Sequence, residues 1–256
     1  MVRGLDTFRT WFKDYSDNYI IIGGTACDAA LSDAGLTARA TKDIDIILII
    51  EALSETFVSR FWDFVRNAGY QTCEQEIEKR NAYRFLKPTD TSFPIQIELF
   101  SRKPDALALP SDIHITPIPV EEGLSSLSAI LLDDNYYEFT LQHSIFFEDV
   151  HYADATALIC LKSYAFLSNK KLKESGINIH SINIDKHKND VFRILPLLSP
   201  NNTIDLPTAI HNNMKEFAEA IVTELPPQQM LNEAGYDNLT PEDIYHNLLS
   251  IFQLKQ

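Results

Sequence analysis

Along the first hundred residues, continuous apolar runs alternate with segments whose apolar residues recur at helical spacing. This pattern predicts strands alternating with helices. Continuous apolar or β-branched runs predict four strands, at 19–22, 44–50, 82–86 and 94–100. Apolar residues at helical spacing predict three helices, at 5–16, 25–31 and 54–67. The last of these is followed by Gly69, a residue type that commonly ends a helix.

The pattern changes in the second half of the chain. Residues 101–150 contain several prolines, and the aromatic segment 136–141 has the composition of a strand. Four later segments have helical periodicity, at 155–168, 185–198, 206–225 and 240–254. We therefore expect an α/β (α+β) fold: a mixed sheet with flanking helices in residues 1–150, and a helical domain in residues 151–256 that closes a cleft.

Composition narrows the classes of function. The net charge of −14 disfavours a general nucleic-acid coat, because neutralising phosphates needs clustered lysine and arginine. The three cysteines show no C-x-x-C spacing, which favours a reducing compartment over a disulfide framework. The N-terminal residues lack an apolar signal region, and no apolar run reaches membrane-spanning length. We expect a cytoplasmic protein with no membrane partner.

Two aspartates mark the start of the second predicted strand. Asp43 and Asp45 in the segment KDIDI point to the same side, because side chains alternate along a strand. Two neighbouring carboxylates repel each other and resist burial unless a cation offsets their charge. Mg²⁺ does this with oxygen ligands alone. A bare D-x-D pattern is more often simply solvated or caps a turn, so the pair needs further support.

Glu98 supplies that support. It is the one acid in the apolar strand IQIELF, where an isolated carboxylate competes with burial. If this strand lies beside the strand of Asp43 and Asp45, the three acids can frame a two-metal site. The pair of aspartates then has a third partner.

The order of these motifs resembles the nucleotidyltransferase superfamily of the DNA polymerase β type. An apolar strand leads into Gly-Gly-Thr-Ala and a helix, D-x-D begins the next strand, and a lone acid lies on a later one. The form GGTA…R…TKDIDI is similar to the abortive-infection (AbiEii-like) toxin branch. The resemblance covers about residues 19–100. Two departures stand out: many members have Gly-Ser where this chain has Gly24-Thr25, and their third acid is often aspartate rather than Glu98.

The resemblance implies a catalytic and a nucleotide-binding set. Asp43, Asp45 and Glu98 would be catalytic and would hold two Mg²⁺ ions, with Mn²⁺ as a substitute. The corner of Gly23, Gly24 and Thr25 would bind the phosphates of an NTP at a helix N-terminus. The resemblance also implies Lys162, Lys186 and Asp190 of the C-terminal helices as nucleotide-binding residues, and the other candidates for this role are Arg39, Lys42 and Arg84.

Basic residues gather in one part of the acidic chain. Between Cys160 and Arg193 there are seven lysines and arginines against three acids, so this segment carries +4 while the rest carries about −18. Such a region attracts a triphosphate. Lys162 interrupts the apolar run ALICLKSYAFL, so we expect its ammonium group to reach the cleft. We interpret Lys170, Lys171 and Lys173 as a solvated helix face.

Other polar residues leave alternatives open. Arg39, Arg80 and Arg84 either bind phosphate or pair with one of the many acids. His187 is the histidine nearest to the proposed site in sequence, and we interpret it as a helix-surface residue. The seven histidines form no H-E-x-x-H motif, and the chain has neither a G-x-S-x-G motif nor a P-loop.

The sequence predicts a Mg²⁺-dependent enzyme that transfers NMP from an NTP to an acceptor hydroxyl. The resemblance implies an RNA or tRNA end, a protein or a small molecule as acceptor, and a role as a toxin with an antitoxin partner or in phage defence. A haloacid-dehalogenase-type phosphatase is disfavoured, because its D-x-D is followed by x-[TV] and position 47 is isoleucine. The remaining alternative is a catalytically inactive nucleotidyltransferase fold that acts as a binding or scaffold module.

Overall fold

The computed structural model describes residues 2–70, 82–101 and 133–254. Its centre is a mixed sheet of six described strands in the order β3-β4-β2-β1-β6-β5. The strands are β1 (Tyr19–Ile22), β2 (Asp43–Leu48), β3 (Ala82–Leu86), β4 (Gln96–Phe100), β5 (Ser144–Phe147) and β6 (Val150–Ala153). β2 pairs antiparallel with β1 and parallel with β4, β1 pairs parallel with β6, and the outer strands β3 and β5 are antiparallel to their neighbours.

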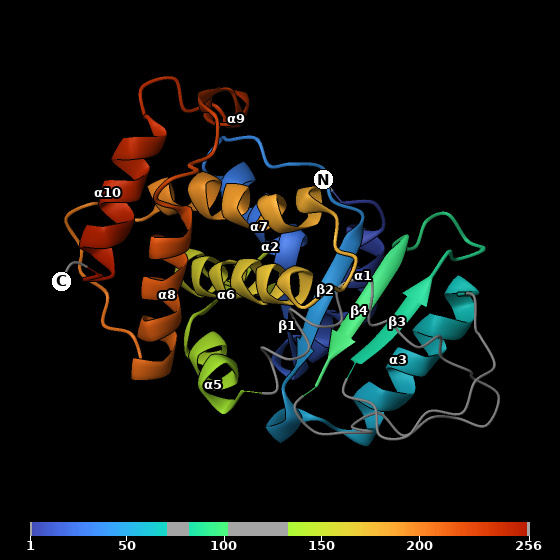
Figure 1. Cartoon of the computed structure of the whole chain (residues 1–256). Coiled ribbons are helices and arrows are strands. Elements are labelled where there is room, and N and C mark those ends of the chain that lie inside the picture. The colour runs from blue at the N-terminus through green and yellow to red at the C-terminus, as the bar shows by residue number, and fades with distance from the viewer. Residues whose placement is uncertain (1, 71–81, 102–132, 255–256) are drawn as a thin grey trace.

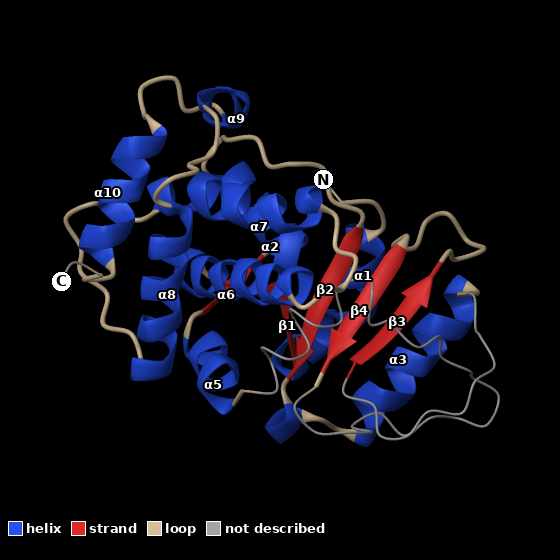
Figure 2. Cartoon of the chain, in the orientation of Figure 1, coloured by secondary structure: helices blue, strands red, loops and turns tan. Residues whose placement is uncertain are grey.

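Helices flank this sheet and fill the C-terminal part of the chain. The first are α1 (Leu5–Phe12), α2 (Gly23–Asp33), α3 (Glu55–Ala68) and α5 (Asp134–Gln142). They are followed by α6 (Ala155–Glu174), α7 (Ser181–Ile194), α8 (Thr208–Ile221), α9 (Gln228–Ala234) and α10 (Pro241–Ile251). Figure 1 shows α3 beside β3, with α6 and α7 on the other side of β2. In Figure 2 the strands β2, β4 and β3 lie to the right of a mass of C-terminal helices.

One face of the sheet is covered by aromatic side chains of α1 and α3. Phe8 of α1 meets Tyr19 of β1 with ring centroids 5.3 Å apart, and Phe61 of α3 meets Phe85 of β3 at 5.4 Å. Such edge-to-face contacts add to the large apolar area that each ring buries. Tyr19 pairs with Leu48, and Phe85 pairs with Ile97, so this face also holds the apolar residues of β2 and β4. The aromatic layer forces the alternate residues of these strands to the opposite face.

The predicted α/β fold is confirmed, and several element boundaries agree closely. The strands at 19–22 and 82–86 have the predicted ends, and α3 begins after Ser54 and ends at Gly69, which has a positive φ of 62°. The Ser54 hydroxyl accepts a hydrogen bond from the Phe57 amide, which satisfies one of the free N–H groups of the first turn. The predicted N-terminal helix is shorter, because residues after Phe12 form the 3₁₀ turn Lys13–Asn18.

The predicted strand at 136–141 is wrong, because these residues lie in helix α5. The Asp133 carboxylate accepts a hydrogen bond from the Asn135 amide at 2.8 Å and caps the helix. The aromatic residues suggested a strand, yet Tyr136 and Thr140 are four apart and both buried, as helical spacing requires. Tertiary burial therefore outweighed β propensity.

Other elements of the second half begin or end where periodicity did not indicate. Helix α7 begins at Ser181 rather than at 185, and α9 was not predicted. Strands β5 and β6, of four residues each, were also missed. The last described strand in chain order, β6, ends at Ala153 and leads directly into α6. The functional division of the chain at residue 150 stays a prediction.

Two general expectations can be compared with the described residues. Cys27 and Cys160 are buried and unbridged, while Cys73 lies outside the described residues. Of the helices within residues 2–70, 82–101 and 133–254, none combines the length and the apolar character that crossing a bilayer requires.

Candidate functional site

The site begins at the corner where β1 leads into α2. Gly23 has a φ of +67°, a conformation that L-residues with a side chain rarely adopt. A Cβ atom on Gly23 would lie 1.8 Å from Oδ2 of Asp45, and one on Gly24 would lie 2.6 Å from the Thr41 hydroxyl. Glycine is therefore required at position 23 both for the turn and for the close approach of a carboxylate.

Thr25 fixes this corner to the next strand. Its side chain is fully buried, and its hydroxyl donates a hydrogen bond of 2.6 Å to the backbone carbonyl oxygen of Asp43. This bond joins the first turn of α2 to the start of β2. The Thr25 side chain thus positions the strand that carries the aspartates, and any contact of Thr25 with phosphate stays a prediction.

The acids lie side by side on the sheet face opposite the aromatic layer. Across three neighbouring strands, Arg84 of β3 pairs in register with Glu98 of β4, and Glu98 pairs with Asp45 of β2. Asp43 pairs with Gln96 in the same way. Directly opposed residues share a face of the sheet. The expectation that Glu98 lies on the same side as the two aspartates is therefore confirmed.

A cavity of about 510 Å³ opens over these residues, between the sheet and helices α6 and α7. Its acids are Asp43, Asp45 and Glu98. Its cationic lining residues are Arg39, Arg84, Lys162 and Lys186. The rest of its polar lining is formed mainly by amide and imidazole side chains: Gln96, Asn169, Asn178, Asn183, His180 and His187. The size is in the range of pockets that bind small molecules.

Burial and mutual repulsion keep protons on the acids at higher pH than usual. Burial first, and then the neighbouring Glu98 carboxylate, raise the pKa of Asp45 to about 7. Burial also raises the pKa of Asp43 and of Glu98, against the opposing effect of nearby cations. Ionisation of these carboxyl groups is therefore unfavourable in the cavity floor, and a cation bound there would lower all three pKa values.

Glu98 has a different environment from the aspartates. Its Oε1 atom accepts hydrogen bonds from Arg84 Nε at 2.8 Å and from Gln96 Nε2 at 2.6 Å, and it forms an ion pair with Arg84 Nη2 at 2.7 Å. The side chains of Arg84 and Glu98 are 9% and 12% exposed, so solvent screens this pair weakly. Of the alternatives for Arg84, the structure shows pairing with an acid, and that acid is a buried one of the site.

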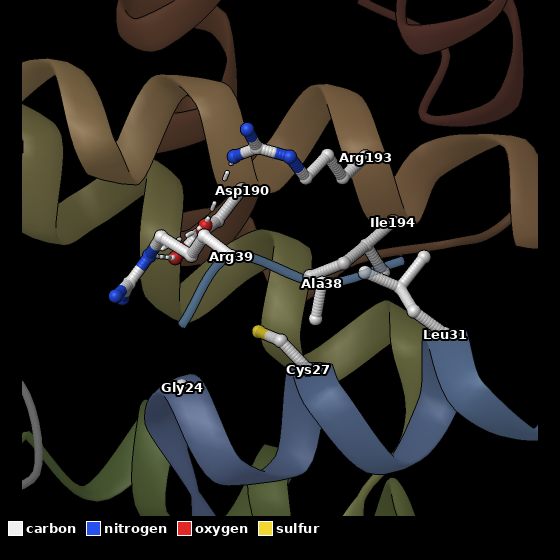
Figure 3. A pocket seen from close by; sticks show the side chains of 8 residues that line it. All are labelled: Gly24, Cys27, Leu31, Ala38, Arg39, Asp190, Arg193 and Ile194. Carbon is white, nitrogen blue, oxygen red and sulfur yellow. Dashed lines mark hydrogen bonds and ion pairs between the residues drawn. The ribbon is translucent and has the colours of Figure 1, made fainter. Parts of the chain in front are cut away.

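A second charged cluster lies beside the acids and is centred on Asp190 of α7. Lys162 Nζ lies 2.9 Å from Asp190 Oδ2, and Arg39 Nε lies 2.9 Å from Asp190 Oδ1. Arg193 Nη1 is 3.7 Å from Oδ1. Figure 3 shows Asp190 between Arg39 and Arg193, close to the start of α2 at Gly24. Although burial opposes it, the charges of Lys162 and Arg39 lower the pKa of Asp190 to about 2.

The predicted cations are thus distributed between the two clusters. Lys162 reaches the cavity, as expected, and its ammonium group donates a hydrogen bond to Asp190. Lys186 lines the same cavity, and burial together with the charges of Lys162 and Arg39 lowers its pKa. Lys42 is exposed and is not one of the lining residues. Arg80 lies outside the described residues.

The interpretation of His187 as a surface residue is wrong. Its side chain is buried, it lines the cavity, and its Nδ1 atom has no hydrogen-bond partner among the described residues. Burial first, and then the charges of Lys162 and Lys186, place its pKa well below the ordinary value, so the imidazole is neutral. Among the lysines interpreted as solvated, Lys171 and Lys173 are exposed.

Sequence reasoning missed the amide residues of the cavity. Asn169 lies seven positions after Lys162 on α6, and Asn183 lies three before Lys186 on α7. These spacings place each asparagine on the same helix face as a predicted lysine. That periodicity was the available signal.

The acids are suited to a hard divalent cation, although with unequal roles. Asp43 and Asp45 present carboxylates to the cavity, and their pKa values are raised because ionisation is unfavourable there. A hard divalent cation would offset the negative charge of the ionised carboxylates. Within residues 2–70, 82–101 and 133–254, no three His, Cys, Asp or Glu side chains are grouped as ligands of one metal ion. Because Arg84 and Gln96 occupy Oε1 of Glu98, the aspartates form the better-suited pair, and Glu98 as a metal ligand stays a prediction.

Comparison with known proteins adds no assignment: no family model and no curated protein matches the chain.

Proposed function

We propose that the protein is a Mg²⁺-dependent nucleotidyltransferase that transfers NMP from an NTP to an acceptor hydroxyl and releases pyrophosphate. One observation carries the proposal: a single cavity joins a row of repelling carboxylates to a group of buried and half-buried cations. A nucleoside triphosphate with its metal ion complements both parts, because the metal satisfies the acids and the phosphates satisfy the cations.

The cations favour the triphosphate end of such a substrate. Arg39 and Lys162 lie at hydrogen-bond distance from Asp190, so their charged groups are held in place before any ligand binds. Lys186 faces the same space and has a lowered pKa, which phosphate binding would raise again. The start of α2 at Gly23 and Gly24 adds backbone N–H groups that favour an anion.

The amide side chains of the cavity are suited to bind the nucleoside part of the substrate. Asn178 and Asn183 lie near the connection between α6 and α7, whereas Lys162 and Asp190 lie farther along these helices. Amides donate and accept hydrogen bonds without adding charge, as recognition of a base or ribose requires. The cavity thus contains uncharged amide groups as well as cations.

Asp43 and Asp45 would hold the metal in this proposal. A bound Mg²⁺ supplies neutralisation of the triphosphate and a lower pKa for the acceptor hydroxyl. The chain's own part is to keep the two carboxylates oriented: Thr25 fixes the backbone of Asp43, and the absence of a side chain at Gly23 leaves room for the Asp45 carboxylate. This orientation is the kind of preorganisation on which phosphoryl transfer depends.

The acceptor is defined only by class: an RNA or tRNA end, a protein or a small molecule. The net charge of −14 favours a small footprint on any nucleic acid, such as its 3′ end. The resemblance of the GGTA…R…TKDIDI motif to AbiEii-like toxins is the reason to test a toxin role with an antitoxin partner.

Transfer of a labelled nucleotide tests the function. We expect the protein, incubated with each α-labelled NTP, Mg²⁺ and total cellular RNA or protein, to label one class of acceptor. Asp45→Ala should reduce labelling at least about 10³-fold, which corresponds to about 4 kcal/mol of transition-state stabilisation. Asp185→Ala on α7 is the control, because its side chain is half exposed and forms an ion pair with Lys188, which does not line the cavity.

The results separate the proposal from its alternative. Labelling that persists in Asp45→Ala contradicts the proposal. The engagement of Glu98 by Arg84 is the observation that favours a non-catalytic binding module. That module predicts NTP binding by equilibrium dialysis with no transfer to any acceptor, and with little change in binding between wild type and Asp45→Ala.

A further inference from the structure

We propose that Arg84 is a built-in cation of this site and stands in for a second metal ion, so that the site binds one divalent cation rather than two. The inference rests on the proposed function and concerns how its acids are compensated. It differs from the three-acid, two-metal arrangement that the sequence predicts. Its basis is the register and the hydrogen bonds of three neighbouring strands.

Position is the first observation. Arg84, Glu98 and Asp45 follow one another directly across β3, β4 and β2. The backbone position of Arg84 therefore lies on the far side of Glu98 from Asp45, at the end of this row across the sheet. Because this row faces one cavity, all its charges act on the same bound ligand.

The hydrogen bonds at Glu98 are the second observation. Arg84 Nε, Arg84 Nη2 and Gln96 Nε2 all lie within 2.6–2.8 Å of the same oxygen, Oε1. Three donors saturate that oxygen, so Glu98 cannot bind a metal through both oxygens unless Arg84 moves away. Arginine stays protonated at any physiological pH and fits a carboxylate with two N–H groups, so the guanidinium is a stable competitor for a metal.

The charge balance is the third observation. Asp43, Asp45 and Glu98 contribute −3 when ionised, and Arg84 reduces the charge of the row to −2. One divalent cation neutralises that charge, whereas a second would leave the row positive. Lys162 acts on this row only in part, because its ammonium group is also paired with Asp190. Lys186 lines the same cavity, and its positive charge would further disfavour a second metal ion.

Counting bound Mn²⁺ tests the inference without reference to activity. Metal-free full-length protein is titrated with Mn²⁺, alone and with an ATP analogue that has a non-transferable α,β-methylene bridge, and free Mn²⁺ is followed by its electron paramagnetic resonance signal. We expect the wild type to bind one ion per chain. Arg84→Gln should bind a second ion, or the first at least tenfold more tightly, because Glu98 is then uncompensated.

Matched variants keep the test decisive if Arg84→Gln fails to fold. Arg84→Lys retains the charge and should still bind one ion. Glu98→Gln should also bind one ion, more weakly, because Arg84 then repels it. The double variant Arg84→Gln/Glu98→Gln restores a neutral pair and should return to one ion with near wild-type affinity. Circular dichroism confirms folding of each protein.

Two results overturn the inference in different ways. Two Mn²⁺ ions on the wild type, falling to one in Glu98→Gln, would show that Glu98 is a metal ligand and that Arg84 does not replace a metal. The proposed transferase function would survive that result. No Mn²⁺ on the wild type, with or without the analogue, would remove both the inference and the metal-dependent function on which it rests.

Discussion

Asp45 and Asp190 belong to two neighbouring charged clusters and have opposite electrostatic surroundings. Asp190 is fully buried, yet Lys162 and Arg39 contact it and lower its pKa to about 2. Asp45 is partly open to the cavity, yet burial and the neighbouring Glu98 raise its pKa to about 7. The difference between the two acids is therefore the presence of cationic partners and not the degree of burial.

This contrast separates a structural acid from one suited to a ligand. The Asp190 cluster connects the Arg39 loop to α6 and α7, and its charges are compensated within the protein. The row of Asp43, Asp45 and Glu98 is compensated in part, by Arg84 at one end. Uncompensated charge inside a protein lowers its stability unless a ligand supplies the missing partner. Such a conflict is a sign of function.

Breaking the Asp190 cluster should have the largest effect on stability. We expect Asp190→Asn to lower the free energy of unfolding by about 3–5 kcal/mol, because it leaves Lys162 and Arg39 without their buried partner. Urea denaturation monitored by circular dichroism measures this loss. Asp185→Asn on the same helix is the control: its side chain is 46% exposed, and the change should be below about 1 kcal/mol. Equal losses of stability in Asp190→Asn and Asp185→Asn would contradict a stabilising role of the cations around Asp190.

Adding a methyl group at Gly23 should disturb the acid row. We expect Gly23→Ala to cost about 2–3 kcal/mol of stability, because alanine is strained at a φ of +67° and its Cβ would displace the Asp45 carboxylate. Nucleotidyl transfer should fall with it. Gly35→Ala is a matched control, since Gly35 has a φ of +72° with no atom near its Cβ position. It carries the backbone strain alone, about 1–2 kcal/mol, and should retain transfer.

Neutralising Asp45 should have the smallest effect on stability and the opposite sign. A carboxyl group with a raised pKa binds its proton more tightly in the folded state, so its charge destabilises the fold as pH rises from about 4 through about 7. In metal-free buffer we expect Asp45→Asn to be about 1–2 kcal/mol more stable than wild type at pH 8 and equal to it at pH 4. Urea denaturation at several pH values checks this. A destabilised Asp45→Asn at pH 8 would mean that Asp45 is compensated like Asp190.

The first half of the fold followed from the sequence, because its signals are local. The isoleucine-rich runs at 19–22 and 44–50 have few alternatives to buried strands, and Ser54 and Gly69 mark the ends of α3. In the second half, the aromatic segment 136–141 was predicted as a strand and forms α5. Over so short a segment the side chains fit both the periodicity of a strand and that of a helix, and packing against the surrounding core selected the helix.

The sequence could identify candidate site residues, but it could not show which of them contact one another. The D-x-D spacing placed Asp43 and Asp45 on one face, and the lone acid in β4 indicated Glu98. Neither pattern could show that Glu98 shares an oxygen with Arg84 and Gln96, or that Arg39 and Lys162 meet at Asp190, 151 and 28 positions away. His187 was predicted on a surface because helical periodicity does not show which face a neighbouring helix covers.

The sequence by itself determined the strands, most helices and the identity of the acids, because strand alternation and helical spacing depend on near neighbours along the chain. The tertiary structure decided which charges are compensated. Register across β3, β4 and β2 brought Arg84 to Glu98 and left Asp45 beside a like charge, while the packing of α6, α7 and the Arg39 loop enclosed Asp190 with cations. Electrostatic energy depends on distance in space, so only the folded arrangement distinguishes these two acids.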